Sequence, residues 1–427
     1  MNKQPARKLH DGTLYWPSTL DRRDELGRHP SLSEKLVTRV AVIGGGMTGA
    51  IIGASLAEAG IPAVILEGRR AAAASTAAST GLLQFSNDIM MSELADRHGD
   101  QAAVRFYEQC RGAVGSLGRL AAAAGQWNDG FRPASSLYAA SSEADEAKLM
   151  REFRMLEKNG FPVAWGAPAA MPSSVAEAFP ASMTTYGDAL ANPPRLARAL
   201  LRMASDKGVS IFEQSPVREV RRRGGSWVIS AGDGEVAASH IVVATGYIPG
   251  ISAASELKPI LRRTYALATR PGSIAPDWPE DSMVWETARP YFYFRTTPDG
   301  RIVAGGLDED RPDPAGDETF LRDRSNKLIA DLKRYFPDAE FEAEYAWCGT
   351  FGESADDLPF IGEDKEQPGI FHSMGCGGNG TVYSSLAASM LLAALSGEKH
   401  PLAEMLNPRR LILRGDDSGK RGRSLLA

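Results

Sequence analysis

Apolar residues come in short runs separated by glycines, and the first clear run lies near residue 40. Val40 to Ile43 is β-branched and apolar, which is typical of a buried parallel strand. A helix is expected at roughly 47–59, Gly60 ends it, and 61–66 form a second apolar run. The pattern therefore predicts a strand, a helix and a second strand in succession.

The turn between the first strand and the helix carries a glycine motif. Gly44, Gly46 and Gly49 match GxGxxG. The first glycine permits the tight turn, the second lets the backbone approach a pyrophosphate, and the third lets the helix pack closely. Glu67 ends the second strand, where an acid that binds ribose is expected. A glycine turn before an ordinary helix is the alternative, but this context favours a dinucleotide, and an acid at 67 argues against NADP.

Later segments bear on whether the dinucleotide is NAD or FAD. Residues 239–247 predict a strand that ends in Ala244, Thr245 and Gly246, like the strand that passes the adenosine half of FAD in flavoproteins. Val217 falls where such proteins often contact the adenine. No second GxGxxG follows the first. Together these features favour FAD.

A second glycine loop lies near the end of the sequence. Residues 370–373 predict a strand, glycines surround Asn379, and Thr381 opens an apolar helix. A glycine loop that presents a helix N-terminus binds anions, and it would stabilise the negative charge of a reduced flavin ring. Taken alone, the segment is equally well interpreted as a glycine-rich turn before a core helix.

In combination and order, these motifs resemble those of the FAD-dependent D-amino acid oxidase and sarcosine oxidase superfamily, also called the glycine oxidase family. The matching segments span about residues 38–410: GGGMTG with Glu67, 75–81, 243–246, YFYFRTTPDGRIVAGG at 291–306, 347–362, and the terminal glycine loop. Within the superfamily, WCGTF…DDLPFIG…FHSMGCGGNGTVYS looks closest to the γ-glutamylputrescine oxidase type.

The resemblance implies an α/β fold, in which a Rossmann-like FAD-binding domain is interleaved with an α+β substrate domain built on an antiparallel sheet. It assigns 38–85, 186–257 and 346–427 to the FAD-binding domain and 86–185 and 258–345 to the substrate-binding domain. Residues 1–37 are then an N-terminal extension.

The motifs and the resemblance together predict a set of residues around noncovalent FAD. They are Gly44, Gly46, Met47, Thr48, Gly49, Glu67, Gly68, Arg69, Ser75, Thr76, Ser79, Thr80, Val217, Ala244, Thr245, Gly246, Gly349, Gly375, Gly377, Gly378, Asn379, Gly380 and Thr381.

The sequence departs from the family at the substrate side. Glycine-oxidase-type members usually carry an arginine four residues after the tryptophan, where it grips the substrate carboxylate, and this chain has Phe351 there. The absence of that arginine disfavours a simple α-amino acid substrate, and Arg295, Arg263 or Arg262 are the candidates to replace it.

Two further departures concern the flavin. Covalent members attach it to a cysteine at a position occupied here by Gly349, with Cys348 one residue early, so we expect noncovalent FAD. Cys376 lies in the glycine loop and is more simply a buried thiol than a functional one. Sarcosine-oxidase-like members use a lysine to activate oxygen, and the matching strand here has Arg301 and no lysine.

The predicted reaction is amine oxidation by the flavin, which needs no obligatory protein base. Tyr291, Tyr293 and Arg295 alternate along one strand and share a face, so Tyr293 and Arg295, with Trp347, are the candidate catalytic residues. The opposite face, with Phe292 and Phe294, is an equally good candidate for the pocket side.

Composition narrows the function classes. The 427 residues carry a net charge of −5, which gives no basic footprint for nucleic acid. Three separated cysteines predict neither a disulfide framework nor a metal site, and they indicate a reducing, cytoplasmic setting. No segment has the length and apolarity of a membrane span. A small amine is the expected partner, and the oligomeric state stays open.

Three alternatives remain at this point. The chain could be a flavin dehydrogenase of D- or secondary amino acids that passes electrons to a quinone, an NAD-dependent dehydrogenase, or a flavin-binding subunit without turnover.

Overall fold

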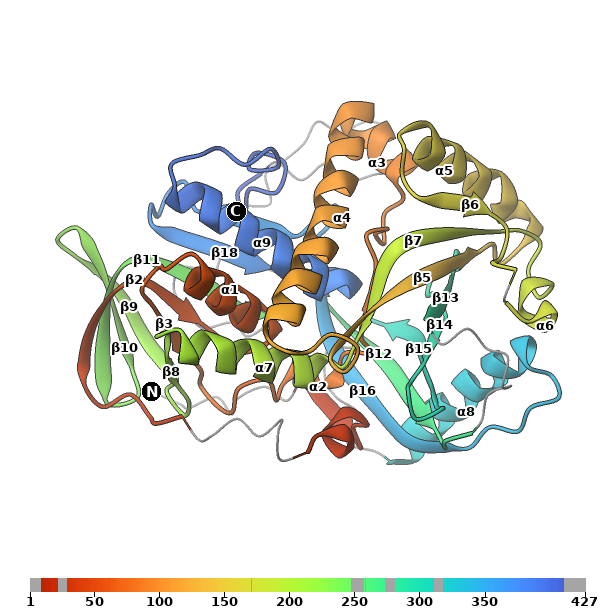
Figure 1. Ribbon diagram of the computed structural model, residues 1–427, viewed down its shortest axis with the longest axis horizontal. Coiled ribbons are helices and arrows are strands. Elements are labelled where there is room, and N and C mark those ends of the chain that lie inside the picture. Colours follow the sequence, from red (N-terminus) through yellow and green to blue (C-terminus); the bar gives the residue numbers. More distant parts are fainter. Residues whose placement is uncertain are drawn as a thin grey trace.

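The computed structural model describes residues 9–21, 29–169, 171–246, 257, 259–272, 281–310 and 318–410. Two sheets occupy the two ends of the molecule, and helix α4 stands between them (Figure 1). Parts of the predicted domains at 1–8, 22–28, 170, 247–256, 258, 273–280, 311–317 and 411–427 lie outside the described residues.

The first sheet has eight described strands and a parallel centre. Across the sheet they are β17 (Phe360–Glu363), β18 (Ile370–Met374), β11 (Gly234–Gly246), β2 (Lys35–Ile43), β3 (Ala63–Leu66) and β8 (Ser210–Phe212), with β9 (Val217–Arg223) and β10 (Ser226–Ala231) extending β11 as an antiparallel hairpin.

Both faces of the parallel centre are covered, which explains its continuous apolar runs. The last four residues of β2 are all buried. Helix α1 (Met47–Glu58) packs against α7 and α9 on one side. On the other side Trp227 and Ile229 of the hairpin join Ile43 and Val243 in one cluster.

The second sheet has ten described strands and is mostly antiparallel. They are β1 (His10–Gly12), β16 (Ala343–Glu353), β12 (Ile260–Thr269), β15 (Ile302–Glu309), β14 (Tyr293–Thr296), β13 (Ser282–Glu286), β5 (Phe131–Ala139), β7 (Ser182–Ala191) and β4 (Leu82–Leu83), with β6 (Val163–Trp165) beside β7.

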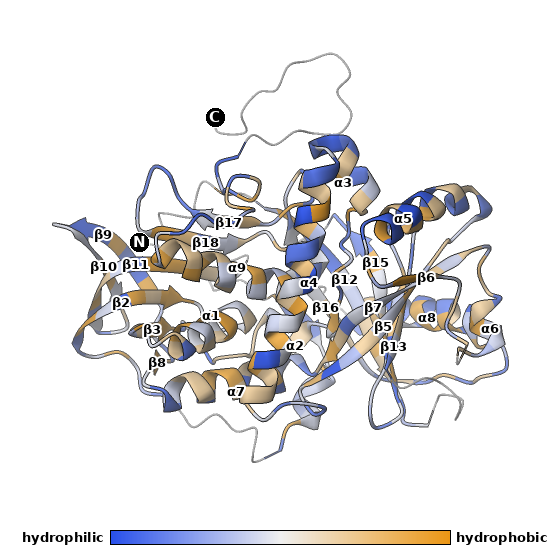
Figure 2. Cartoon of the chain, turned by 45° about the horizontal axis from the view of Figure 1, so that its top comes forward, coloured by the Kyte–Doolittle hydropathy of each residue, from blue (hydrophilic) through white to orange (hydrophobic). Residues whose placement is uncertain are grey.

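The remaining helices cover these sheets. They are α2 (Ser75–Ala78), α3 (Met91–His98), α4 (Asp100–Ala123), α5 (Glu146–Lys158), α6 (Ser173–Ala176), α7 (Pro193–Asp206), α8 (Glu318–Tyr335) and α9 (Gly380–Leu395), with 3-10 turns η1 (Trp16–Thr19), η3 (Glu143–Asp145) and η5 (Gly377–Asn379). Figure 2 shows hydrophilic residues on the outer surface of α5 and along the β9 edge.

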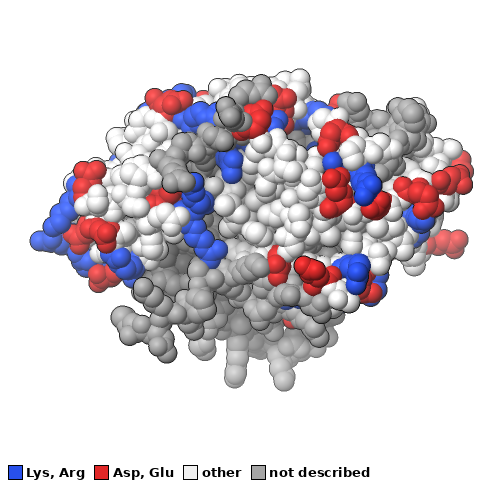
Figure 3. All heavy atoms as spheres, turned by 90° about the horizontal axis from the view of Figure 1, so that it is seen from below, with Lys and Arg blue, Asp and Glu red and all other residues white. Residues whose placement is uncertain are grey.

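Charge is distributed without a single-sign field on the face drawn in Figure 3, where acidic and basic side chains lie interspersed. Basic side chains gather at the end that carries the β9–β10 hairpin. There Arg221 pairs with Glu219 and Glu235, as expected of a solvated hairpin.

The predicted α/β fold class is confirmed, and the elements of the first motif begin and end close to the predicted residues. The pairing refines the proposed domain boundaries, because β16 and β4 belong to the second sheet although 346–353 and 82–83 were assigned to the FAD-binding domain. The N-terminal extension is partly integrated, since β1 adds to the edge of the second sheet beside β16.

Candidate active site

The first glycine turn joins β2 to α1, and its shape requires glycine. Gly44 has φ +115°, and a Cβ there would overlap the carbonyl oxygen of Ala244 in β11. A Cβ at Gly49 would overlap the carbonyl oxygen of Gly44, so this glycine lets α1 pack on the turn. Gly46 is the N-cap of α1, and the helix therefore presents its N-terminal end, with its positive partial charge, at the turn.

Glu67 follows β3 and closes one side of this turn. Its carboxylate accepts a hydrogen bond from the Gly45 amide at 2.7 Å and another from the Arg69 amide at 2.7 Å. Two backbone donors thus fix the acid at the place predicted for ribose recognition.

The short helix α2 supplies hydroxyl groups beside the N-terminus of α1. The Met47 amide donates to Thr76 Oγ1 at 2.9 Å. Within the described residues, the buried hydroxyls of Ser75 and Thr245 have no hydrogen-bond partner. A buried hydroxyl without a partner is costly, so both are suited to contact a polar ligand.

The second glycine loop follows β18 and leads through η5 into α9. Gly375 and Gly377 have φ +63° and +53°. The side chain of Asn379 is held by two hydrogen bonds, in which its Nδ2 donates to the carbonyl of Gln84 at 2.8 Å and to Asn87 Oδ1 at 2.9 Å. Asn379 therefore anchors the loop.

A single cavity of about 710 Å³ joins the two glycine loops. Of the residues predicted around FAD, it is lined by Gly44, Gly46, Met47, Thr48, Glu67, Gly68, Arg69, Ser75, Thr76, Ser79, Thr80, Val217, Ala244, Thr245, Gly246, Gly349, Gly375, Gly377, Gly378, Gly380 and Thr381. Gly49 and Asn379 do not line it, and they shape the two loops from behind.

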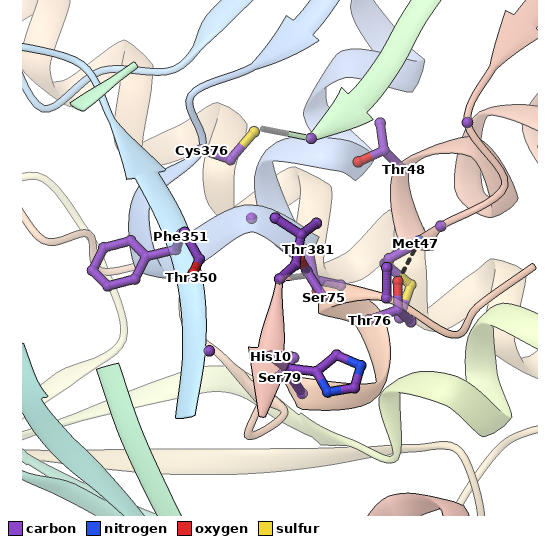
Figure 4. A pocket seen from close by; sticks show the side chains of 18 of the residues that line it. His10, Met47, Thr48, Ser75, Thr76, Ser79, Thr350, Phe351, Cys376 and Thr381 are labelled. Atoms are coloured by element: carbon purple, nitrogen blue, oxygen red, sulfur yellow. Dashed lines mark hydrogen bonds between the residues drawn. The ribbon is translucent and has the colours of Figure 1, made fainter. Parts of the chain in front are cut away.

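Figure 4 shows the two parts of this cavity. Met47 and Thr76 lie on one side, and Phe351 projects from β16 on the other. We call the part near 44–80 the dinucleotide end, and the part formed by Tyr291, Tyr293, Asp308 and Phe351 the substrate end.

Aromatic side chains dominate the substrate end. Trp347 is buried and lines the cavity, and its Nε1 donates to the carbonyl of Ala78 at 2.9 Å. Thr80 Oγ1 donates to the Tyr293 hydroxyl at 3.4 Å, and Tyr291 donates to Asp88 at 3.1 Å. Burial raises the pKa of Tyr293 to about 12 and that of Tyr291 well above its usual range. Both phenols therefore stay neutral near pH 7.

Arg295 is not placed as predicted, and it does not line the cavity. Its guanidinium donates to the carbonyls of Gly81 at 3.0 Å and Ala191 at 2.7 Å, and it lies 5.4 Å from the Trp16 ring. The predicted alternation is correct, but the strand carries this residue past the cavity, where it ties β14 to β7.

The other candidate arginines do not replace the missing carboxylate clamp either. Arg262 is paired directly opposite Phe351, yet its side chain forms ion pairs with Glu353 and Asp310. Neither Arg262 nor Arg263 lines the cavity.

The cysteines divide between core and cavity. All three are free and buried. Cys348 packs in the cluster beneath α8, with Tyr265 and Leu328, while its neighbour Gly349 faces the cavity. Cys376 does line the cavity, and burial raises the pKa of its thiol to about 12.

Several lining residues have no counterpart in the sequence prediction. They are Leu9, His10, Ala72, Ala73, Ala74, Thr264, Asp308, Thr350, Ser373 and Met374, among others. Leu9 and His10 reach the cavity because β1 pairs with β16, and Asp308 reaches it because of an irregularity in β15. No local sequence motif indicates either the pairing or the irregularity.

These features fit a bound flavin dinucleotide. Two loops whose backbone conformation requires glycine face one cavity, an acid is fixed beside the first, and unpartnered hydroxyls line the walls. Such a combination is typical of dinucleotide sites in α/β proteins.

Comparison with known proteins agrees. The family model described as FAD dependent oxidoreductase, DAO, matches residues 39–395, and the chain therefore belongs to this family of FAD-dependent oxidoreductases. Glycine oxidase of Geobacillus kaustophilus is 25% identical over 381 residues, covering 84% of this chain and 93% of that protein. Gamma-glutamylputrescine oxidoreductase of Escherichia coli is 22% identical, with 86% of each chain covered.

A solved structure supports the same fold. The crystal structure of glycine oxidase from Geobacillus kaustophilus superposes with a TM-score of 0.70 at 23% identity, covering 90% of this chain and all of that one (100%). Among the helices that the structure describes, none has the length and apolarity needed to cross a bilayer.

Proposed function

We propose that this chain oxidises the carbon–nitrogen bond of an amine, either a polyamine derivative or a substituted amino acid, to an imine that hydrolyses. Oxygen is the proposed electron acceptor and hydrogen peroxide the product. The observation that carries the proposal is the single cavity, in which a dinucleotide site continues into an aromatic substrate end with Phe351 at the position of the family's usual arginine.

FAD, when bound, accepts two electrons from the carbon–nitrogen bond. The amides of the first glycine turn and the N-terminus of α1 would hold its diphosphate, and Glu67 its ribose. The N-terminus of α9 would place positive partial charge near the ring. Trp347, Tyr291 and Tyr293 would exclude water from the reacting atoms and orient the amine.

Phe351 favours an amine over a simple α-amino acid. An α-carboxylate is normally held by a bidentate cation in a buried site. Phe351 lines the substrate end, and the arginine opposite it, Arg262, is engaged by Glu353 and Asp310. A substrate with a free carboxylate would therefore leave that group poorly paired.

The alternative is a D-amino acid or secondary amino acid dehydrogenase that passes electrons to a quinone. It draws support from the lack of lysine among the described residues that line the cavity. Arg301, on the matching segment, is occupied with Asp299 and with the carbonyl of Thr269.

We place the reaction in the cytoplasm, because Cys110, Cys348 and Cys376 are free thiols.

Anaerobic flavin bleaching tests the proposal. The purified yellow holoprotein is mixed with polyamines, γ-glutamylated amines, N-methyl amino acids and D-amino acids, and the loss of flavin absorbance is followed. We expect amines to bleach faster than amino acids, and peroxide to match substrate consumption in air. Bleaching by D- or N-substituted amino acids alone, with dye reduction far exceeding peroxide, would establish the alternative.

A pair of variants sharpens this test. Phe351→Arg restores a cation at the substrate end, and Phe351→Leu is the matched apolar control. We expect Phe351→Arg to raise the ratio of kcat/KM for amino acids over amines by about tenfold or more, a change of roughly 1.4 kcal/mol, and Phe351→Leu to leave the ratio near that of the wild type.

A further inference from the structure

Strand β15 contains an irregularity beside the cavity. Ala266 and Tyr265 of β12 pair with Gly305 and Gly306, but the next pair is Arg263 with Glu309. Leu307 and Asp308 therefore both face the single residue Thr264, which is the arrangement of a β-bulge. Leu307 has φ +61°, a conformation that costs a non-glycine residue on the order of 1 kcal/mol and that is concentrated at functional sites.

The bulge decides which acid reaches the cavity. Side chains alternate along a strand, so a regular β15 would turn Glu309 to the side of Gly305 and Asp308 to the opposite side. Instead Asp308 lines the cavity beside Thr264, while Glu309 forms an ion pair with Arg324 of α8 on the other face of the sheet. A strained residue thus delivers one carboxylate to the substrate end.

Charge around Asp308 favours a cationic ligand. Burial raises the pKa of Asp308, and the nearby carboxylates of Glu353 and Asp88 raise this pKa further. A hydrogen bond with Thr264 and the positive charge of Arg262 lower it, and the resulting pKa is about 6. Arg262 itself is paired with Glu353 and Asp310, so it offers little compensation. Tyr291 and Tyr293, the other titratable groups facing Asp308, are held neutral by burial.

We propose that Asp308 binds the ammonium group of the substrate and accepts its proton before oxidation. The inference rests on the proposed function and names its substrate class, an amine without a carboxylate beside the reacting nitrogen. In this step the N–H bond of R–CH2–NH3+ breaks and an O–H bond forms on Asp308, leaving R–CH2–NH2 and a neutral carboxylic acid. No electron leaves the substrate in this step, and the neutral amine retains the lone pair that its oxidation requires.

A cation that can be neither oxidised nor deprotonated tests recognition separately from turnover. Tetramethylammonium is titrated into the oxidised holoprotein, and binding is read from the flavin absorption spectrum, with acetate as the anionic comparison. We expect Asp308→Asn to weaken tetramethylammonium binding by about tenfold or more. Glu309→Gln, which removes the adjacent acid on the other face, should leave it within about twofold of wild type.

The pH dependence of tetramethylammonium binding separates a direct role of Asp308 from a purely structural one, because a structural role would leave this dependence unchanged. Wild-type affinity for tetramethylammonium should rise as pH increases through about 6, because Asp308 ionises there, and the Asp308→Asn profile should be flat. FAD content and Tm are measured for each variant. Should Asp308→Asn fail to retain FAD, the wild-type profile decides, and equal affinity at pH 5 and pH 7.5 would overturn the proposal.

Proton transfer is tested by anaerobic flavin reduction with putrescine. We expect Asp308→Asn to lower the reduction rate at pH 7 by about 100-fold, and the loss to shrink as pH rises and free amine accumulates. Unchanged cation binding in Asp308→Asn, or tighter binding of acetate than of tetramethylammonium by the wild type, contradicts the inference while leaving amine oxidation standing. Asp308-dependent cation binding in a protein that no amine or amino acid reduces supports the cation site and contradicts the proposed function.

Discussion

The dinucleotide end and the substrate end of the cavity are built in different ways. The dinucleotide end is made of backbone: the turn at Gly44, the N-terminus of α1 and an acid fixed by two amides. The substrate end is made of side chains from β14 and the residues just before it, from β15 and from β16, brought together by strand pairing and by one bulge. A short local motif is thus sufficient to form the dinucleotide end. The lining of the substrate end, in contrast, changes with each substitution of a strand residue that faces it.

The largest effect is expected on FAD binding, at Gly44, where the backbone of the glycine turn lies against the backbone of β11. Gly44→Ala would place a Cβ against the Ala244 carbonyl at positive φ, and neither group can move away easily. We expect a penalty of about 2–4 kcal/mol, hence roughly 30- to 1,000-fold weaker FAD binding by equilibrium titration. Gly112→Ala, in α4 with open space around it, is the matched control and should bind FAD normally. Equal FAD affinity in both variants would contradict a backbone-built site.

Arg295 tests where the substrate end stops. Arg295→Lys keeps the positive charge but loses the planar fork that reaches the carbonyls of Gly81 and Ala191. We expect a loss of about 2–3 kcal/mol in the free energy of unfolding, with substrate preference unchanged. Arg222→Lys, on the exposed hairpin, is the control. An Arg295→Lys variant with normal Tm but altered substrate preference would show that Arg295 belongs to the substrate site.

Asp308 should lower stability near neutral pH, because its pKa is raised in the folded state. A carboxyl with a raised pKa opposes folding above that value, and the penalty disappears as pH falls below its unfolded pKa. With a shift from 3.8 to about 6, Asp308→Asn should raise the free energy of unfolding at pH 7.5 by about 2–3 kcal/mol. Tm measured from pH 3.5 to 8 checks this, and the two proteins should converge at the acidic end. A lower Tm for the variant at pH 7.5 would contradict the assigned environment.

The smallest effect is expected at the anchor of the second glycine loop. Asn379→Ala leaves the carbonyl of Gln84 and Asn87 Oδ1 without this donor, which should cost about 1–2 kcal/mol of stability. Because Asn379 does not line the cavity, kcat should change much less than Tm. Asn159→Ala, at an exposed helix end, is the control. A large loss of kcat without loss of Tm would give Asn379 a direct role instead.

The same contrast explains what the sequence could and could not predict. The strand, glycine turn, helix and Glu67 are consecutive, so their spacing alone identifies the dinucleotide end. The alternation of side chains along 291–295 predicts that Tyr293 and Arg295 lie on the same face of the strand. It does not predict where along that face the cavity ends. Asp308 was missed because a bulge is invisible in GGLDED, where regular alternation would select its neighbour. His10 was missed because its partner Gly349 is far along the chain.

The most direct test of the account is a crystal structure of the yellow holoprotein. We predict one FAD whose diphosphate contacts the turn at Gly46 and Thr48, at the N-terminus of α1, and whose ring lies between Gly377 to Thr381 and the Tyr291–Tyr293 side of the cavity. A flavin bound with its ring elsewhere, or a diphosphate remote from α1, would contradict the claim that these two distant glycine loops serve one cofactor.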